Sequence, residues 1–327
     1  MRIIFEPYIY KHIFVPWFYP HGHVRMAKLF RILNTRADLA HNIVTFDGCL
    51  YPQLDKSQSP CEGVSLPSFI KRWRHEWSVD RMLARTIVTS LHHMVNVKSL
   101  TLRDFDWTGS QSETLVYGAI CSTECLPSLT TLIVHGRTFY RPDQVRDHSR
   151  QLSLIIRSHP LLERLELRSG NWDLGSWIVQ SDVPNLSYLM ARPGDARVLI
   201  RGRPITSLFI NRTLTADLDA WEAPAISAVS TICVTLHYLE NVVVESVVRF
   251  VVTHFKDVQE LIVNGIYFHE LSSLFSSFPS FCNLRTLRFG VRNLFDGTGK
   301  KMDENQRIDA IICSVLMWIL LPSSYHI

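Results

Sequence analysis

Residues 126–136 read LPSLTTLIVHG, and the spacing within this stretch decides the fold. An aliphatic residue is followed by two free positions, a second aliphatic residue, one free position and a third. The stretch HPLLERLELRSG, at residues 159–170, has the same spacing. In the two stretches the aliphatic positions are Leu129, Leu132, Val134, Leu162, Leu165 and Leu167.

The same spacing recurs along most of the chain. The other units are Val97/Leu100/Leu102, Leu186/Leu189/Ala191, Ile205/Leu208/Ile210, Val229/Ile232/Val234, Val258/Leu261/Val263 and Leu284/Leu287/Phe289, with a weaker copy at Ile43/Phe46/Gly48. From residue 97 onward, successive units begin 19 to 33 residues apart. Leucine-rich repeats are about 20–29 residues long, so most intervals fit and the two longest are expected to carry insertions.

Helical periodicity appears in four of the segments between these units. The apolar positions with that spacing are Val79/Met82/Leu83/Ile87/Leu91, Leu152/Ile155/Ile156, Val247/Val248/Val251/Val252/Phe255 and Leu271/Leu274/Phe275/Phe278. Each unit therefore combines a helix with a short strand. A single helix and strand cannot bury an apolar face alone, so the units are expected to stack side by side.

This pattern predicts an α/β leucine-rich-repeat solenoid. We expect an irregular horseshoe, with parallel strands on its concave face and helices on its convex face. A conventional α/β domain with buried parallel strands is the alternative. The predicted segments are a strand-helix lead-in to the first degenerate repeat at 1–47, an irregular loop and insertion at 48–78, the core solenoid at 79–292, and a loop with the C-terminal helix of a truncated last repeat at 293–327.

No recognisable catalytic motif is found in the sequence. Gly297 to Lys300 read GTGK, but Leu294 and Lys301 stand where a phosphate-binding loop needs a glycine and a Ser or Thr. The seven cysteines are odd in number and irregular in spacing, which predicts reduced thiols. We therefore predict no catalytic, cofactor-binding or metal-binding residues. An unrecognised α/β enzyme remains a third reading, which a deep pocket lined by converging acids and bases would favour.

Charge and hydropathy patterning bear on partners and location. The net charge of +4 comes from 34 basic and 30 acidic side chains, which does not indicate a nucleic acid or a membrane as partner. The apolar run Ile311 to Leu321 is shorter than the ~20 residues that span a bilayer, so we expect a buried helix there. The expected location is cytoplasmic or nuclear.

The alternation of side chains along a strand identifies candidate binding residues. If Leu165 and Leu167 point into the core, then the residues between and beside them face the concave side. Applied to every unit, this rule selects Arg103, His135, Arg164, Glu166, Arg168, Tyr188, Arg192, Phe209, Asn211 and Arg288. Five of these, Arg164, Arg168, Tyr188, Arg192 and Phe209, come from three successive strands and are expected to form one patch.

Such a patch would suit an acidic or phosphorylated protein segment, because arginine makes bidentate pairs with carboxylates and phosphates. The alternative is that these residues only keep the concave face soluble. In the first case, changing Arg164 and Arg168 to Glu is expected to abolish partner binding without lowering the melting temperature.

The chain resembles the fungal F-box proteins with degenerate leucine-rich repeats. The resemblance rests on LPSLTTLIVHG, HPLLERLELRSG, FCNLRTLRFG and the early stretch FEPYIYKHIFV…LFRILNTRADLAHNIVTF. It implies a first strand within Glu6–Val15, then a helix within Leu29–Phe46 that runs into the first repeat. The F-box itself, a helical segment of roughly 40 residues in that family, is not seen in this chain.

The resemblance implies a non-enzymatic protein-protein interaction module, the substrate-recognition part of an SCF-type ubiquitin ligase. A Skp adaptor and a cullin are then expected as partners only if an F-box exists upstream. The alternative is a free-standing leucine-rich-repeat scaffold with no ligase role.

Overall fold

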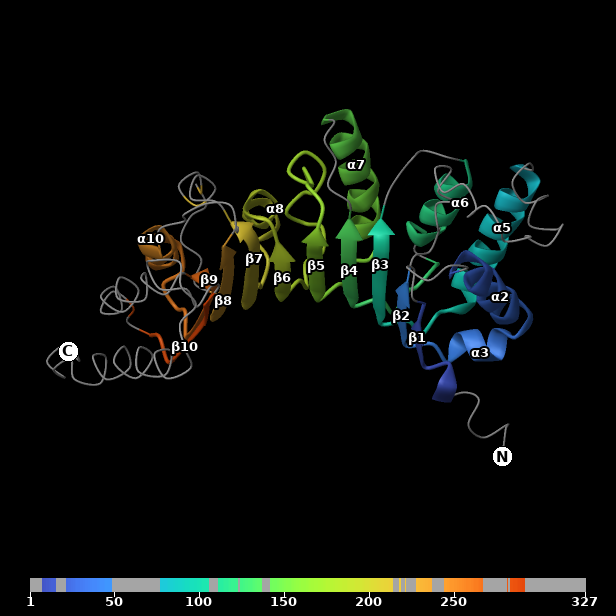
Figure 1. Cartoon of the computed structure of the whole chain (residues 1–327), viewed down its shortest axis with the longest axis horizontal. Coiled ribbons are helices and arrows are strands. Elements are labelled where there is room, and N and C mark those ends of the chain that lie inside the picture. Colours follow the sequence, from blue (N-terminus) through green and yellow to red (C-terminus); the bar gives the residue numbers. More distant parts are fainter. Residues whose placement is uncertain are drawn as a thin grey trace, which may run out of the picture. The chain divides into compact units, whose positions relative to one another are not determined.

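A computed structural model describes residues 8–15, 22–48, 77–105, 111–122, 124–136, 142–213, 218, 221, 228–236, 244–266, 281 and 283–291. The chain divides into two compact units, Met1–Asn185 and Leu186–Ile327. Each unit is described by itself below, with the element labels of Figure 1.

The first unit is built on five parallel strands that follow one another in sequence order (Figure 1). They are β1 (His12–Phe14), β2 (Thr45–Gly48), β3 (Ser99–Phe105), β4 (Thr131–Gly136) and β5 (Arg164–Ser169). The middle aliphatic position of the repeat stands in register on every strand. That row is Ile13, Phe46, Leu100, Leu132 and Leu165, and all five side chains are buried.

Helices connect these strands and pack against one another in order. They are α2 (Gly22–Thr35), α3 (Ala37–His41), α5 (Trp77–His93), α6 (Gln111–Ile120) and α7 (Pro142–Ser158). Along the row, α2 contacts α5, α5 contacts α6, and α6 contacts α7. The helix predicted before residue 162 is α7, and its Leu152, Ile155 and Ile156 are buried as expected.

The prediction for α5 was wrong in one respect. Ile87 and Leu91 are buried, but Met82, which was assigned to the same face, is 62% exposed. Ala84 is buried instead, because the face that meets the core passes through residues 84, 87 and 91. These positions are spaced three and four residues apart, as one face of a helix requires.

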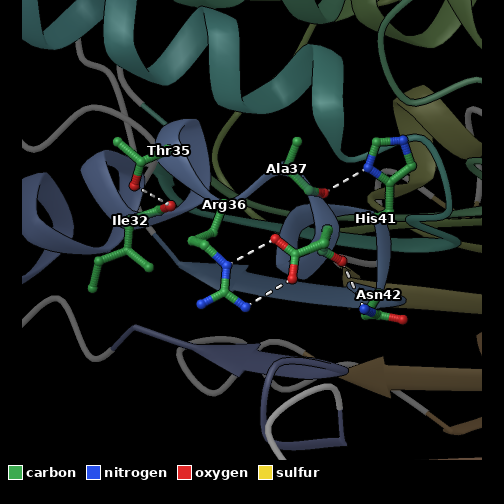
Figure 2. Close-up of polar contacts among 7 residues, drawn as sticks. Ile32, Thr35, Arg36, Ala37, His41 and Asn42 are labelled. Carbon is green, nitrogen blue, oxygen red and sulfur yellow. Dashed lines mark hydrogen bonds and ion pairs between the residues drawn. The ribbon is translucent and has the colours of Figure 1, made fainter. Parts of the chain in front are cut away.

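The connection between α2 and α3 is held by local polar contacts (Figure 2). Thr35 donates its hydroxyl to the Ile32 carbonyl at 3.0 Å, at the end of α2. The Arg36 guanidinium makes a bidentate ion pair with Asp38: Nε donates to Oδ1 at 2.9 Å and Nη2 donates to Oδ2 at 2.8 Å. The Asn42 amide donates to the Asp38 carbonyl at 2.7 Å. These contacts end one helix and begin the next, so the helix implied within 29–46 is two helices followed by β2.

A second set of five parallel strands forms the other unit. They are β6 (Tyr188–Ala191), β7 (Ser207–Thr213), β8 (Thr231–Leu236), β9 (Glu260–Ile266) and β10 (Thr286–Val291), again in sequence order. The row Leu189, Leu208, Ile232, Leu261 and Leu287 is in register, and its first four members are buried. Two described helices belong to this unit, α8 (Pro193–Leu199) and α10 (Val244–His254).

In α10, Val247, Val248 and Val251 are buried as predicted, but Val252 keeps part of its surface and Phe250 is buried as well. The helix predicted through Leu271 to Phe278, residues 49–76 of the predicted loop and insertion, and the C-terminal segment 293–327 lie outside the described residues. The division of the sequence into four segments remains a prediction.

Backbone hydrogen bonds link each strand start to the next one in both units. One carbonyl just before a strand accepts two successive N–H groups from the following repeat, and we call this series the carbonyl ladder. Its acceptors are the carbonyls of Lys11, Val44, Lys98 and Thr130 in the first unit, and of Ser187, Thr206, Ser230 and Gln259 in the second. The repeats are therefore aligned at the beginning of each strand.

The segment that follows β5 packs against the end of β4. Trp172 is buried there, and its indole N–H donates to the Ser169 carbonyl at 3.1 Å. The ring lies so close to Gly136 that a Cβ at that position would be 2.3 Å from the indole. A side chain at Gly136 would displace Trp172, so glycine is required at the end of β4.

Candidate functional site

The sheet of the first unit has an open face, which we define as the side toward which the strand residues between the buried ones point. On β4, Leu132 and Val134 are buried, while Thr131, Ile133 and His135 keep part of their surface. In register with Ile133 are Asp47 on β2, Thr101 on β3 and Glu166 on β5. The charged side chains Asp47 and Glu166 therefore point to the same face, from strands on either side of β3 and β4.

Arg103 is held on the open face by two partners. Its Nε and Nη2 atoms donate to the two carboxylate oxygens of Asp47, at 2.5 and 2.7 Å. The hydrogen bond with Asp47 raises the pKa of Arg103 above its ordinary value. The ring of Phe14, from β1, lies on the guanidinium with its centroid 5.4 Å from Cζ. Arg103 is thus fixed in position by an acid and an aromatic ring.

Glu166 differs from the expectation that it would be exposed. Its side chain is 0% exposed, because Arg164 and Arg168 cover it from both sides along the same strand. Arg164 donates to Oε1 at 2.7 Å through Nε, and Arg168 donates to Oε2 at 2.6 Å. The two arginines themselves are 44% and 45% exposed. Glu166 therefore positions the arginines and does not present its own carboxylate.

This arrangement also corrects the expected effect of changing both arginines to Glu. Such a variant would place three carboxylates side by side on β5 and remove both partners of a buried one. A buried charge without its partner costs several kcal/mol. The melting temperature is therefore expected to fall, contrary to the expectation from the sequence.

His135 lies among these charged groups. Its Nε2 atom is buried and has no hydrogen-bond partner within the part of the chain that the structure describes. Burial lowers the pKa of His135, and the charges of Arg103 and Arg168 lower it further, against the opposite effects of Asp47 and Glu166. The imidazole is therefore neutral at pH 7, and its Nε2 makes no hydrogen bond to the described residues.

The open face of the second unit has a different chemistry. Met190, Phe209, Cys233 and Ile262 are in register on four successive strands. The rings of Tyr188 and Phe209 stack, with centroids 4.9 Å apart and an angle of 28° between planes. The row is largely apolar and ends on β10 at Arg288, which pairs with Glu260 at 3.2 Å.

The remaining predicted residues are also placed by the structure. Asn211 lies on β7 and is half-buried, and Arg192 is the residue before the first turn of α8. Of the five residues predicted to form one patch, Arg164 and Arg168 belong to the first unit. Tyr188, Arg192 and Phe209 belong to the second. Each unit therefore carries its own part of the predicted binding surface.

Several residues of these faces were missed by the sequence reasoning. Asp47 could have been found, because it follows Phe46 as Glu166 follows Leu165 and so points to the open face. Phe14 lies on the strand that only the family resemblance implied. Cys233 and Ile262 carry no charge or motif, and only the register shows that they continue the row of Met190 and Phe209.

The cysteines and a surface hollow add little chemistry. Burial raises the pKa of Cys121 and of Cys125 to about 11, so both are protonated thiols at neutral pH. Among the described residues, no three His, Cys, Asp or Glu side chains are placed to share a metal ion, and no helix there is long and apolar enough to cross a membrane.

A hollow of about 700 Å³ is lined by Pro142, Val145, Arg146, Asn171, Asp173, Ser176 and Trp177. These residues belong to α7 and the segment after β5.

Comparisons with known proteins give limited information. No family model matches the sequence, and no curated protein matches it. Among solved structures, the leucine-rich-repeat-containing protein LegL7 from Legionella pneumophila aligns at 11% sequence identity with a TM-score of 0.44, covering 89% of this chain and 96% of that one. The fold assignment rests on the strands themselves, which are parallel, follow in sequence order and keep the repeat in register. The chain has an α/β leucine-rich-repeat fold.

Proposed function

We propose that this chain is a non-enzymatic protein-binding scaffold that holds a partner on the open faces of its strands. The observation that carries the proposal is the pair of half-exposed arginines fixed on the buried carboxylate of Glu166. Arginine is enriched at the energetic centres of protein interfaces. Side chains already held in place lose less conformational entropy when a partner binds. The open face of the first unit therefore presents donors that are ready for contact.

The charges on this face favour an acidic or phosphorylated segment of the partner. Three guanidinium groups, those of Arg103, Arg164 and Arg168, stand against the two carboxylates of Asp47 and Glu166. The excess is positive, and opposite charges at an interface favour the correct partner and speed its association. In the second unit, the stacked Tyr188 and Phe209 offer aromatic surface of the kind that interfaces use.

The finer role that we propose is substrate recognition for an F-box ubiquitin ligase, with a Skp adaptor and a cullin as further partners if an F-box segment precedes this chain. Its support is the resemblance of the repeat sequences to fungal F-box proteins. A free-standing scaffold uses the same surface without those partners. A cytoplasmic or nuclear location belongs to both versions, and the unpaired thiols of Cys121, Cys125 and Cys233 are in keeping with it.

The test is affinity capture of partner proteins from the native cells. The parent protein is compared with a variant in which three charged residues of the open face are replaced at once. Arg164→Gln/Glu166→Gln/Arg168→Gln removes two positive charges and one negative, so no buried charge is left alone. The matched control is Arg36→Gln/Asp38→Asn, which removes an exposed pair of the same kind elsewhere in the first unit. Circular dichroism checks that both variants are folded.

We expect a partner captured by the parent protein and the control to be lost from the open-face variant. A Skp adaptor and a cullin among the captured proteins would support the ligase role. A reproducible partner without them would support the free-standing scaffold. Capture that is the same for all three proteins would contradict a role of this face in binding.

A further inference from the structure

We propose that Arg103, His135 and Arg168, which we call the basic row, form a binding site for a phosphate monoester carried by the partner. The inference rests on the proposed function, because it names the chemistry that the partner brings to the open face of the first unit. It selects a different trio from the arginine patch expected from the sequence, since His135 has the central place.

Register brings the basic row together. Each of the three residues follows the last aliphatic position of its repeat, which is Leu102, Val134 or Leu167. These three aliphatic residues are paired across β3, β4 and β5 and are buried. Beyond these three residues the pairing shifts, so that His135 pairs with Ser169 and Phe105 pairs with Gly136. Arg103 and Arg168 still turn to the open face, because they bind Asp47 and Glu166 there. Both lie close enough to His135 for their charges to act on its imidazole.

The arginines of the row keep donors for a ligand after their internal pairs are made. A guanidinium group has five N–H donors. Asp47 accepts from Nε and Nη2 of Arg103, and Glu166 accepts from Nε of Arg168. The acids use the inner edge of each group and fix its orientation. Within the described part of the chain, the other N–H groups of these two arginines make no hydrogen bond, and both side chains are partly exposed.

His135 supplies the polar atom that lacks a partner. Its Nε2 is buried and makes no hydrogen bond within the described part of the chain. With its proton on Nε2, the imidazole would donate to an anion oxygen once the ring turns this atom out of its buried position. A buried polar atom without a partner is rare in folded proteins and calls for an explanation, and a ligand site provides one.

The tetrahedral shape and charge of a phosphate monoester suit this row. The group carries a charge of about −1.5 to −2 at pH 7 and has three acceptor oxygens, one for each of three donating side chains. A carboxylate has two oxygens and a single charge. The charged groups that surround His135 are Arg103, Arg168, Asp47 and Glu166. A bound dianion would oppose the effect of the two arginines, so binding would raise the pKa of His135 and take up a proton.

The experiment is a titration of the full chain with phenyl phosphate, followed by NMR of the histidine rings. The His135 signals are assigned by their loss in His135→Gln. We expect these signals to shift and saturate with phenyl phosphate at pH 7.5, where the ligand is a dianion. Benzoate, which has the same ring and a carboxylate, is expected to bind at least about tenfold more weakly, because it offers fewer charge-assisted hydrogen bonds.

Variants test which residues hold the anion. Arg103→Gln and Arg168→Gln are each expected to weaken phenyl phosphate binding about tenfold or more, the effect of losing one charged partner. Arg103→Lys keeps the charge and loses the two-pronged geometry, and it guards against loss of folding. Arg36→Gln removes a similar two-pronged arginine outside the row and is expected to leave binding unchanged.

Two results would overturn the proposal. One is the absence of a saturable shift of the His135 signals, and the other is equal binding of benzoate and phenyl phosphate. Neither depends on finding a partner protein, so the phosphate site can fail while the open face still binds a protein. Saturable phosphate binding that survives in the Arg103 and Arg168 variants would also contradict the assignment.

Discussion

The two units share one backbone plan and differ in what their open faces carry. In the first unit, the face is charged, with Asp47, Arg103, Glu166 and two further arginines joined in ion pairs. In the second, the corresponding row holds Met190, Phe209, Cys233 and Ile262. In both units, the residues of the open face alternate along each strand with buried residues, and the buried residues of neighbouring strands are in register. The buried positions of a repeat thus determine the sheet, while the positions between them remain free to differ in chemistry.

The largest expected loss of stability comes from removing the partners of the buried acid Glu166. Arg164→Met/Arg168→Met keeps the cover over Glu166 and removes both positive charges. We expect the free energy of unfolding to fall by about 3 kcal/mol, because a buried carboxylate is left unpaired. Urea denaturation measures the change, and adding Glu166→Met is expected to recover most of it.

The matched change in the second unit is Arg288→Met, which removes the partner of Glu260. Arg288 is 69% exposed, so water replaces it and the expected loss is below about 1 kcal/mol. A loss as large as that of the β5 variant would remove the proposed difference between the two faces.

The next effect belongs to the apolar face. Phe209→Ala removes the ring that stacks on Tyr188 and is expected to lower the free energy of unfolding by about 1–2 kcal/mol, since the ring is only half-buried. Phe209→Leu keeps apolar surface and should lose less. Denaturation curves of the two variants at 0.1 and 1 M salt test the point, because an apolar contact does not weaken with salt.

Acid should act on the first unit through two histidines. Burial lowers the pKa of His135, as do Arg103 and Arg168, and burial also lowers the pKa of His159, whose Nε2 lies 2.9 Å from the Ile120 carbonyl. Below pH 6.5 the unfolded chain binds protons at these residues more readily than the folded chain does. Stability is therefore expected to fall as the pH drops from about 6.5 towards the folded pKa values.

Thermal unfolding across this pH range measures that loss. His135→Gln and His159→Gln are each expected to reduce the slope of stability against pH. A slope that is unchanged in both variants would show that other groups cause the acid sensitivity.

The smallest effect concerns the shape of one ion pair. Arg103→Lys keeps the charge next to Asp47 but cannot make the two-pronged contact or cover the Phe14 ring in the same way. We expect a loss of roughly 0.5–1 kcal/mol in thermal unfolding, the scale of a partly exposed pair. A neutral result would mean that charge alone holds this part of the face.

The buried side of the fold could be predicted from the sequence, because three aliphatic residues at fixed spacing recur in every unit. All nine units that show the spacing carry a strand, from Phe46 on β2 to Leu287 on β10. Two helices were not predicted. The α6 helix is short and interrupted by Gly118, and α8 has only seven residues, so neither gives a periodic signal.

The open face could be predicted in position but not in arrangement. Alternation placed Arg164, Glu166 and Arg168 on the same side of β5, as the structure has them. Their order, a carboxylate between two arginines at every second position, already indicates that the acid lies beneath the pair. The pairing of Arg103 with Asp47 and the isolation of His135 Nε2 depend on how strands 56 and 33 residues apart meet, which spacing alone does not show.

The carbonyl ladder has a consequence for how such a chain can change over evolutionary time. Within each unit, a repeat is aligned with the next by one carbonyl and two N–H groups at the start of a strand. The segment that leads from one strand to the next takes no part in this alignment, so its length can vary without shifting the register. Insertions and deletions of several residues can therefore accumulate between repeats, while a single residue gained or lost within a strand start would put every following side chain on the wrong side of the sheet.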